Sequence, residues 1–148
     1  MTTWRRDGFE ISVDPARLQV DAIADALART YWAAGRSRDV IVRSLEHSRA
    51  YGLYHGNRQI GLARVITDLA TFAYLCDVYV LEEYRGRGLG KWLIEVVVND
   101  PALASLRRWL LATRDAHGLY RRTGFTELKA PDRWMERFEP NGPAAPAT

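Results

Sequence analysis

The chain has 148 residues, of which 47% are hydrophobic and 26% are charged, and its net charge is +3 at pH 7. This length favours one domain with a single core, and the composition is typical of a soluble globular protein. The mild positive charge alone does not indicate a nucleic-acid-binding protein, because that function needs basic residues gathered on one face. No apolar run approaches the length of about 18 residues that a membrane span needs.

The cysteine content and the N-terminal segment indicate a compartment. The single cysteine, Cys76, lies within an apolar stretch, so no disulfide can form within the chain and buried packing is its expected role. Residues 1–8 lack the apolar segment of a signal peptide. We therefore expect a soluble, cytoplasmic protein with no membrane partner.

The first half of the chain predicts three strands and two helices. The strands are expected at residues 9–13, 50–55 and 59–67. Asp14 followed by Pro15 is typical of a helix start, and Ser37 can cap a second helix. Gly56 and Asn57 separate the last two strands and favour a tight hairpin turn.

The second half predicts strands that alternate with helices and a hairpin at the end. The strands are expected at residues 73–80, 108–112, 125–128 and 133–138. A helix should start near Leu89, because apolar residues recur there at helical spacing, and a shorter one should stop at Gly124. This order predicts a mixed sheet with helices on both faces. We expect residues 1–139 to form a single domain and residues 140–148, rich in proline and alanine, to be disordered.

The most informative segment lies between the strand that ends near residue 80 and the helix that follows it. It reads Arg85-Gly86-Arg87-Gly88-Leu89-Gly90-Lys91. Glycines allow successive backbone N–H groups to point into one concavity, and a helix N-terminus adds about half a positive charge. With three basic side chains as well, the segment is expected to bind a di-anionic group, and a pyrophosphate fits best.

Two common phosphate loops do not match this spacing. A Walker A loop needs a glycine where this chain has Arg85, and a serine or threonine where it has Trp92. A dinucleotide-binding Gly-x-Gly-x-x-Gly pattern that starts at Gly86 needs a third glycine where the chain has Lys91. The pattern that remains is Arg-x-x-Gly-x-Gly after a strand.

That pattern resembles the acetyl-CoA pyrophosphate loop of the GCN5-related N-acetyltransferase (GNAT) family. A second motif, Ala116-x-x-Leu119-Tyr120-x-x-x-Gly124-Phe125, resembles the last helix of the same family. With the order of elements, the resemblance covers residues 8–138. It implies an α/β (α+β) fold with a mixed, mostly antiparallel central sheet, flanked by helices and splayed between its fourth and fifth strands.

The resemblance implies an acyltransferase that takes acetyl-CoA as co-substrate. Because His47, His55 and His117 are isolated from other ligand residues in the sequence, we expect no metal. The residues expected to bind acetyl-CoA are Val78, Tyr79, Val80, Arg85, Gly86, Arg87, Gly88, Leu89, Gly90 and Lys91. Tyr120 matches the family tyrosine that stabilises the leaving thiolate, and packing as a core aromatic is the alternative. A tyrosine has a pKa of about 10 and a thiol one of about 8.5, so full proton transfer from the tyrosine to the leaving thiolate is unfavourable. Tyr120 therefore needs nearby positive charge, or it acts as a hydrogen-bond donor without full transfer.

The general base and the acceptor site are less well defined. Tyr74 stands where histone-type members have a glutamate, and Thr113 stands where many members have an asparagine. Asp77 is a weak candidate for the base, with a structural carboxylate as the alternative. Strict alternation places Asp77 on the face opposite Tyr74, unless a bulge intervenes. Tyr31 and Trp32, near the end of the first helix, are candidates for the acceptor pocket, and core packing is their alternative.

Three functions can be compared at this point. The expected one is direct transfer of an acetyl group from acetyl-CoA to a primary amine of a small molecule or peptide, with a homodimer left open. The alternative is a non-catalytic acyl-CoA-binding or regulatory module on the same fold. A nucleic-acid-binding protein that uses the arginines of residues 107–122 would bind with steep salt dependence and fits less well.

Overall fold

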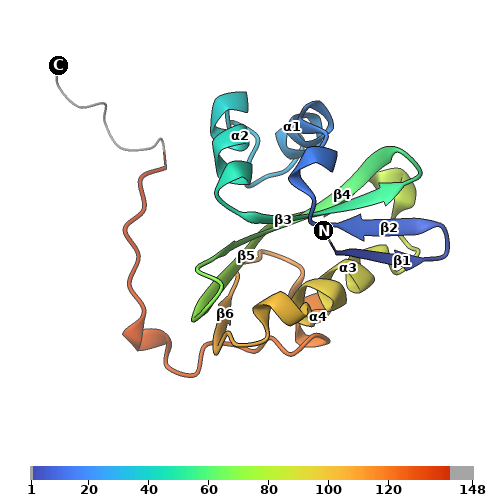
Figure 1. Cartoon of the computed structure of the whole chain (residues 1–148). Helices are drawn as coiled ribbons and strands as arrows, with labels where there is room; N and C mark the ends of the chain where they lie inside the picture. The colour runs from blue at the N-terminus through green and yellow to red at the C-terminus, as the bar shows by residue number, and fades with distance from the viewer. Residues whose placement is uncertain (1, 141–148) are drawn as a thin grey trace, which may run out of the picture.

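A mixed sheet of six strands runs through the described part of the molecule, with helices on both faces (Figure 1). The structure is a computed structural model and describes residues 2–140. The strands are β1 (Thr3–Arg6), β2 (Phe9–Ser12), β3 (Arg49–His55), β4 (Arg58–Thr67), β5 (Phe72–Val80) and β6 (Arg108–Leu110). The helices are α1 (Val20–Ala28), α2 (Arg38–Glu46), α3 (Leu89–Val98) and α4 (His117–Arg121). The strands lie in chain order, and all neighbours are antiparallel except the parallel pair β5 and β6.

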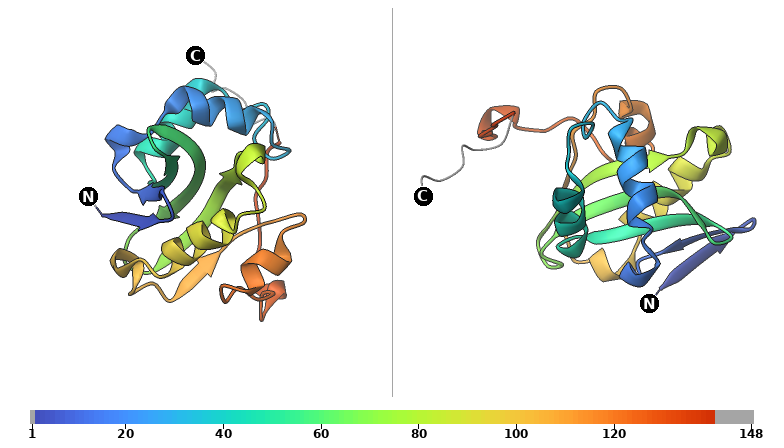
Figure 2. Two further views of the ribbon diagram at one scale, coloured as in Figure 1. Left: turned by 90° about the vertical axis from the view of Figure 1, so that its right-hand side faces the viewer. Right: turned by 90° about the horizontal axis from the view of Figure 1, so that it is seen from above.

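The two faces of the sheet carry separate hydrophobic clusters. Helices α1 and α2 cover one face, while α3 covers the other, and the sheet curves between them (Figure 2). The expected apolar stripe of α3 is confirmed, since its members are all buried: Leu89, Trp92, Leu93, Val96 and Val97. On the opposite face, Ile23 and Leu27 of α1 pack with Leu62 and Tyr79 of the sheet. The layered arrangement that was expected is therefore present.

The hairpin of β1 and β2 was not predicted from the sequence. Its turn consists of Asp7 and Gly8, whose φ angles are 51° and 84°. Arg6 is paired with Phe9 across this two-residue turn. Asp-Gly is a strong local signal for such a turn, but β1 is short and half of its residues are exposed, so it carries no apolar pattern. The hairpin matters because it brings Arg6 close to α3.

The helix starts agree only in part with the sequence prediction. The Ser37 hydroxyl accepts a hydrogen bond from the Val40 N–H at 3.3 Å, which confirms it as the cap of α2. Asp14 does cap a turn, but that turn is a short 3-10 helix at Pro15–Arg17, and α1 begins only at Val20. Helix α1 ends at Ala28, so Tyr31 and Trp32 lie in the connection between α1 and α2.

The predicted closing hairpin is wrong. Residues 125–128 and 133–138 form no strand, and only a 3-10 turn at Pro131–Arg133 interrupts the segment. Their apolar residues do not alternate as in a strand, and no strand of the described chain pairs with them. Met135 and Phe138 are 96% and 73% exposed. The predicted disordered tail, residues 140–148, lies outside the described residues except for residue 140.

Candidate active site

Strand β5 contains a bulge at Asp77. Its pairing with β4 shifts at this point, where Leu62 lies opposite Tyr79 but Arg64 lies opposite Cys76. Asp77 has a φ of 52°, in the left-handed region that few residues other than glycine adopt. The bulge that would change the alternation of β5 is therefore present, and it turns the Asp77 side chain toward the connection between α1 and α2.

The sheet opens between β5 and β6. These strands pair only over Phe72–Tyr74 of β5, opposite Arg108–Leu110 of β6. Beyond Tyr74, β5 continues to Val80 and keeps β4 on one side, but no strand of the described chain pairs with its other side. The splay that was expected between the fourth and fifth predicted strands is thus present between β5 and β6. The candidate cofactor residues Val78, Tyr79 and Val80 belong to the segment that borders the opening.

The glycine-rich loop leads from the end of β5 into α3. Gly86 and Gly88 have φ angles of 81° and 75°, which explains why these two positions are glycines. Gly88 is the N-cap of α3 and offers no side chain to the N–H groups of the first turn. These N–H groups therefore remain available to a bound anion.

The three basic side chains of the loop are exposed, and each has a neighbour. Arg85 Nε donates a hydrogen bond to the Val80 carbonyl at 2.9 Å, which ties the loop to the end of β5. The Arg87 guanidinium lies 5.3 Å from the centre of the Tyr84 ring. Lys91 Nζ is 3.7 Å from a carboxylate oxygen of Glu95, one turn further along α3. The loop is thus strongly positive, although Arg85 is partly engaged by the backbone.

Tyr120 lies on α4 with its hydroxyl group free. Its half-buried ring packs edge-on against Phe125, with 5.9 Å between ring centres. Burial raises the pKa of the Tyr120 hydroxyl to about 12, and the neighbouring Tyr31 adds to this effect. No residue within 2–140 forms a hydrogen bond with this hydroxyl. The group is therefore protonated and able to donate a hydrogen bond to a ligand.

The connection between α1 and α2 contacts both sides of the opening. The Tyr31 hydroxyl accepts a hydrogen bond from the Arg114 N–H at 3.1 Å, and the Arg114 guanidinium lies 3.8 Å from the Tyr31 ring centre. Trp32 Nε1 donates to Asp77 Oδ1 at 2.9 Å. Tyr31 and Trp32 are 51% and 42% exposed, so they are not core residues. The structure brings these two aromatics together with Asp77 and Tyr120.

Asp77 is enclosed by positive charge. Its Oδ2 accepts hydrogen bonds from Arg36 Nη1 at 2.7 Å and from Arg64 Nε at 2.8 Å. Burial alone would raise the pKa of Asp77, but the hydrogen bonds and charges of Arg36 and Arg64 outweigh it, and the pKa lies below its ordinary value. A carboxylate with these partners is a weak proton acceptor, so the geometry favours the structural alternative for Asp77.

Three arginines near the candidate site were not identified from the sequence. Arg36 and Arg64 carry no local motif and reach Asp77 only through the fold. Arg6 reaches the glycine-rich loop from β1, and its Nη2 lies 3.7 Å from the position that a Cβ on Gly88 would take. Only Arg6 had a usable signal, because the turn after it reads Asp-Gly.

The remaining reactive groups suggest no further chemistry. Burial raises the pKa of the Cys76 thiol to about 11, and its Sγ lies 3.5 Å from the Arg64 carbonyl oxygen. Within residues 2–140, no three His, Cys, Asp or Glu side chains are grouped so that they could hold a metal ion.

In the described part of the chain, residues 2–140, no helix is long and apolar enough to span a membrane.

Comparison with known proteins places this chain in a family. A family model described as "Acetyltransferase (GNAT) domain" matches residues 46–127. A protein of Gibberella zeae, whose name gives it as a candidate acetyltransferase, is 36% identical over 140 residues, which cover 79% of this chain and 78% of that protein. The chain belongs to the GNAT acetyltransferase family. Membership implies acyl transfer from acetyl-CoA.

Solved GNAT structures share the fold. A crystal structure of a GNAT-family protein from Xanthomonas campestris pv. campestris is 44% identical and has a TM-score of 0.88, covering 92% of this chain and 96% of that one. A Clostridium acetobutylicum structure, described as a predicted acetyltransferase with acetyl-CoA, has the same fold at 14% identity, with a TM-score of 0.64. The match covers 88% of this chain and 94% of that one.

A further sequence relative is the Glycine max protein "Histone acetyltransferase TAP1". It is 36% identical over 97 residues, which cover 63% of this chain and 42% of that protein.

Proposed function

We propose that this GNAT protein transfers the acetyl group of acetyl-CoA directly to a primary amine of a small molecule or peptide. The observation that carries the proposal is the arrangement around the opening between β5 and β6. The phosphate loop follows the end of β5, and α4 with Tyr120 follows β6, so an anion site and a free hydroxyl flank the same opening. The exposed aromatics of the connection between α1 and α2 border the site on the acceptor side.

Acetyl-CoA would use the open edge of β5 as a binding surface. Its pantetheine arm would lie beside Val78, Tyr79 and Val80 and accept hydrogen bonds from the backbone, as in strand addition. Its diphosphate would bind the free N–H groups between Gly88 and Lys91. In this position the thioester would face Tyr120.

Transfer requires a neutral amine and a stabilised leaving group. The amine attacks the thioester carbonyl carbon, an N–C bond forms, the C–S bond breaks, and CoA leaves as a thiolate that is then protonated. Tyr120 donates a hydrogen bond to the departing sulfur. A lysine-like amine has a pKa of about 10.4 and is neutral about once in 10³ molecules at pH 7, so we assign the loss of its proton to water.

In this proposal Asp77 positions the acceptor pocket. It joins Trp32 and Arg36, both in the connection between α1 and α2, to the bulge of β5. Because its pKa is lowered and its oxygens are already engaged, it holds that connection in place rather than taking a proton from the amine.

Asp77→Asn is therefore expected to raise the KM for the acceptor about tenfold, because the amide loses the charge-assisted bonds to Arg36 and Arg64. The kcat and the affinity for acetyl-CoA should change little. Steady-state kinetics test this, with thermal unfolding as a check of the fold and Asp25→Asn on the exposed side of α1 as the control. A large fall in kcat, an unchanged KM and a shifted pH profile would identify Asp77 as the base instead.

The proposed function is tested by calorimetric titration of the purified protein with acetyl-CoA, with ATP and NAD as controls. A screen of small amines, aminoglycosides, peptide N-termini and lysine peptides then follows the release of CoA thiol. Selective binding of acetyl-CoA with turnover supports the proposal. Selective binding without turnover on any acceptor favours the non-catalytic module, and no binding by folded protein contradicts both.

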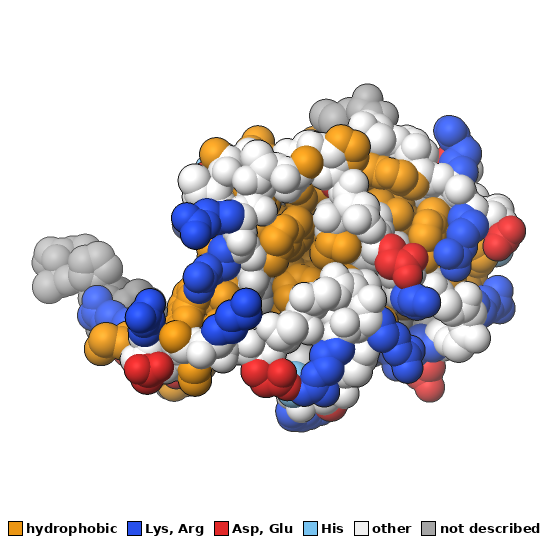
Figure 3. Space-filling model, turned by 90° about the horizontal axis from the view of Figure 1, so that it is seen from below, with side chains coloured by type: hydrophobic (Ala, Val, Ile, Leu, Met, Phe, Trp, Pro, Cys, Tyr) orange, Lys and Arg blue, Asp and Glu red, His pale blue; other side chains and the backbone are white. Residues whose placement is uncertain are grey.

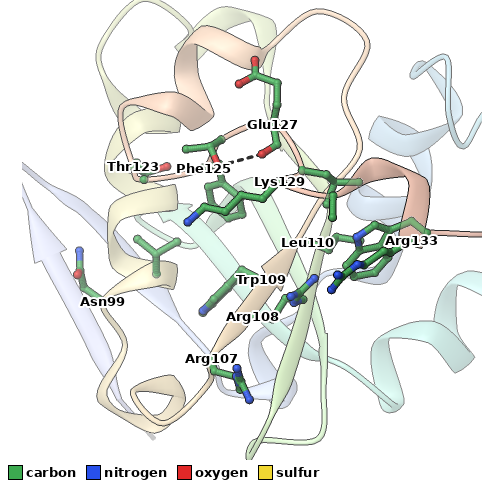
Figure 4. A pocket seen from close by; sticks show the side chains of 16 residues that line it. Asn99, Arg107, Arg108, Trp109, Leu110, Thr123, Phe125, Glu127, Lys129 and Arg133 are labelled. Carbon is green, nitrogen blue, oxygen red and sulfur yellow. Dashed lines mark hydrogen bonds between the residues drawn. The ribbon is translucent and has the colours of Figure 1, made fainter.

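We also propose a homodimer that forms through the segment after α4. A pocket of about 860 Å³ lies between β6 and this segment, and Phe125 and Trp134 line it (Figure 4). The Arg108 guanidinium lies 4.9 Å from the Trp134 ring centre, and beyond it Met135 and Phe138 are exposed. The underside of the molecule shows hydrophobic side chains in a hollow with basic groups around it (Figure 3).

The occupant that fits is the same segment of a second copy. Strand β6 pairs only with β5 among the described residues, so its other edge can accept a strand. Light scattering should give about twice the chain mass of 16.8 kDa. A monomer at all concentrations tested contradicts this part of the proposal.

A further inference from the structure

Arg6 lies beside the first turn of α3. Its guanidinium is 5.1 Å from the Trp92 ring centre, and its Nη2 is 3.7 Å from where a Cβ on Gly88 would be. Gly88 and Trp92 are one helical turn apart, and the Trp92 N–H donates to the Gly88 carbonyl at 3.1 Å. The β1–β2 hairpin thus delivers a positive charge from the start of the chain to the N-terminus of α3.

The charge on Arg6 is not neutralised within the described residues. No carboxylate within 2–140 lies within ion-pair distance of it, and its side chain is exposed. The neighbouring residue differs, because Arg5 Nε donates to Glu10 Oε2 at 2.7 Å. The sequence therefore places two adjacent arginines on β1, of which only one has an acidic partner.

The cations of the loop itself leave room for such a contribution. Arg85 donates to the Val80 carbonyl, and Arg87 lies against the Tyr84 ring. Lys91 lies near Glu95. A di-anion on the first turn of α3 thus meets three side chains that have other neighbours as well, whereas the Arg6 side chain, stacked on the Trp92 ring, forms no hydrogen bond or ion pair within residues 2–140.

We propose that Arg6 is a binding residue for CoA and contacts its diphosphate. This inference rests on the proposed function, since it takes the ligand of the loop to be acetyl-CoA. The diphosphate is favoured over the 3′-phosphate because Arg6 lies next to Gly88, whose turn carries the free N–H groups. The guanidinium can form two parallel hydrogen bonds with phosphate oxygens while it remains stacked on Trp92.

The experiment measures the dissociation constants of acetyl-CoA and of its 3′-dephospho form by calorimetry. Arg6→Gln should weaken both ligands about tenfold, because it removes one charge-assisted contact to the diphosphate. Arg5→Gln is the matched control and should leave both constants unchanged. Arg6→Lys keeps the charge but loses the planar guanidinium, so it should bind both ligands more tightly than Arg6→Gln and less tightly than the wild type, which a purely structural role of the arginine would not predict.

Each other outcome is informative. If the wild type binds acetyl-CoA and Arg6→Gln binds it equally well, the inference is wrong and the proposed function stands. If only the affinity for acetyl-CoA falls, and not that for the dephospho form, Arg6 contacts the 3′-phosphate and the diphosphate assignment is wrong. If Arg6→Lys binds both ligands as weakly as Arg6→Gln does, the positive charge of Arg6 does not contribute to binding and the inference is wrong. If the wild type binds neither ligand, the proposed function fails together with the inference.

Discussion

Gly88→Asp is expected to abolish acetyl-CoA binding while the fold remains intact. The space for its Cβ is open, with Arg6 Nη2 at 3.7 Å as the one neighbouring atom within contact distance. Gly88 has a φ of 75°, and aspartate adopts this conformation at a cost of about 1 kcal/mol. The new carboxylate would lie where the diphosphate binds and would pair with Arg6. Repulsion between the carboxylate and the negatively charged diphosphate should weaken binding about 100-fold or more.

Gly88→Asn separates charge from shape in this experiment. Asparagine has the size of aspartate and tolerates the same left-handed backbone, so both variants should unfold at similar temperatures. The asparagine variant should retain measurable affinity by calorimetry. If the aspartate variant binds acetyl-CoA as tightly as the wild type does, the loop from Arg85 to Lys91 does not hold the diphosphate.

The strand, glycine turn and helix around residues 85–91 could be predicted from sequence because their signals are local. An apolar, β-branched run precedes the turn, glycines occupy the positions with positive φ, and a helical stripe follows. The Ser37 cap was predictable for the same reason, since its partner Val40 is three residues away. Local backbone preferences and short-range hydrogen bonds decide such features, and neither depends on the rest of the fold.

The contacts that Asp77, Tyr31 and Trp32 make could not be predicted in the same way. Trp32 meets Asp77 across 45 residues, and Tyr31 meets Arg114 across 83. These contacts exist because one extra residue in β5 changes the face to which Asp77 points. A single bulge shifts the alternation of every later residue in a strand, and nothing in the composition of residues 73–80 marks its position.

The C-terminal segment shows the opposite error. Residues 125–138 carry apolar and aromatic side chains on both sides of Pro131, which suggested a hairpin, yet they pair with no strand of the described chain. Apolar composition around a turn is not enough, because a strand also needs a neighbour that accepts its backbone hydrogen bonds. The free edge of β6 is such a neighbour, and in the proposed homodimer it would pair with this segment of the second copy.

Tyr120→Phe is expected to lower kcat about 100-fold and to leave the affinity for acetyl-CoA nearly unchanged. The phenylalanine ring would keep the packing against Phe125, so the fold should be preserved. The loss is confined to the hydroxyl, which the proposed mechanism uses as the hydrogen-bond donor to the departing sulfur. Pre-steady-state and steady-state rates of CoA release measure the effect on transfer, and calorimetry measures binding separately.

The pH dependence gives this prediction a second readout. Because the pKa of Tyr120 is raised to about 12, the hydroxyl stays protonated at all lower pH values and is lost as a donor only above that point. The wild-type rate should therefore rise as the acceptor amine loses its proton. It should show no decline at a pH of about 10, where an ordinary tyrosine ionises. Tyr54→Phe is the matched control, since its buried hydroxyl has no hydrogen-bond partner among the described residues and lies outside the site. An unchanged kcat in Tyr120→Phe would leave Tyr120 with a packing role alone and assign stabilisation of the thiolate to another group.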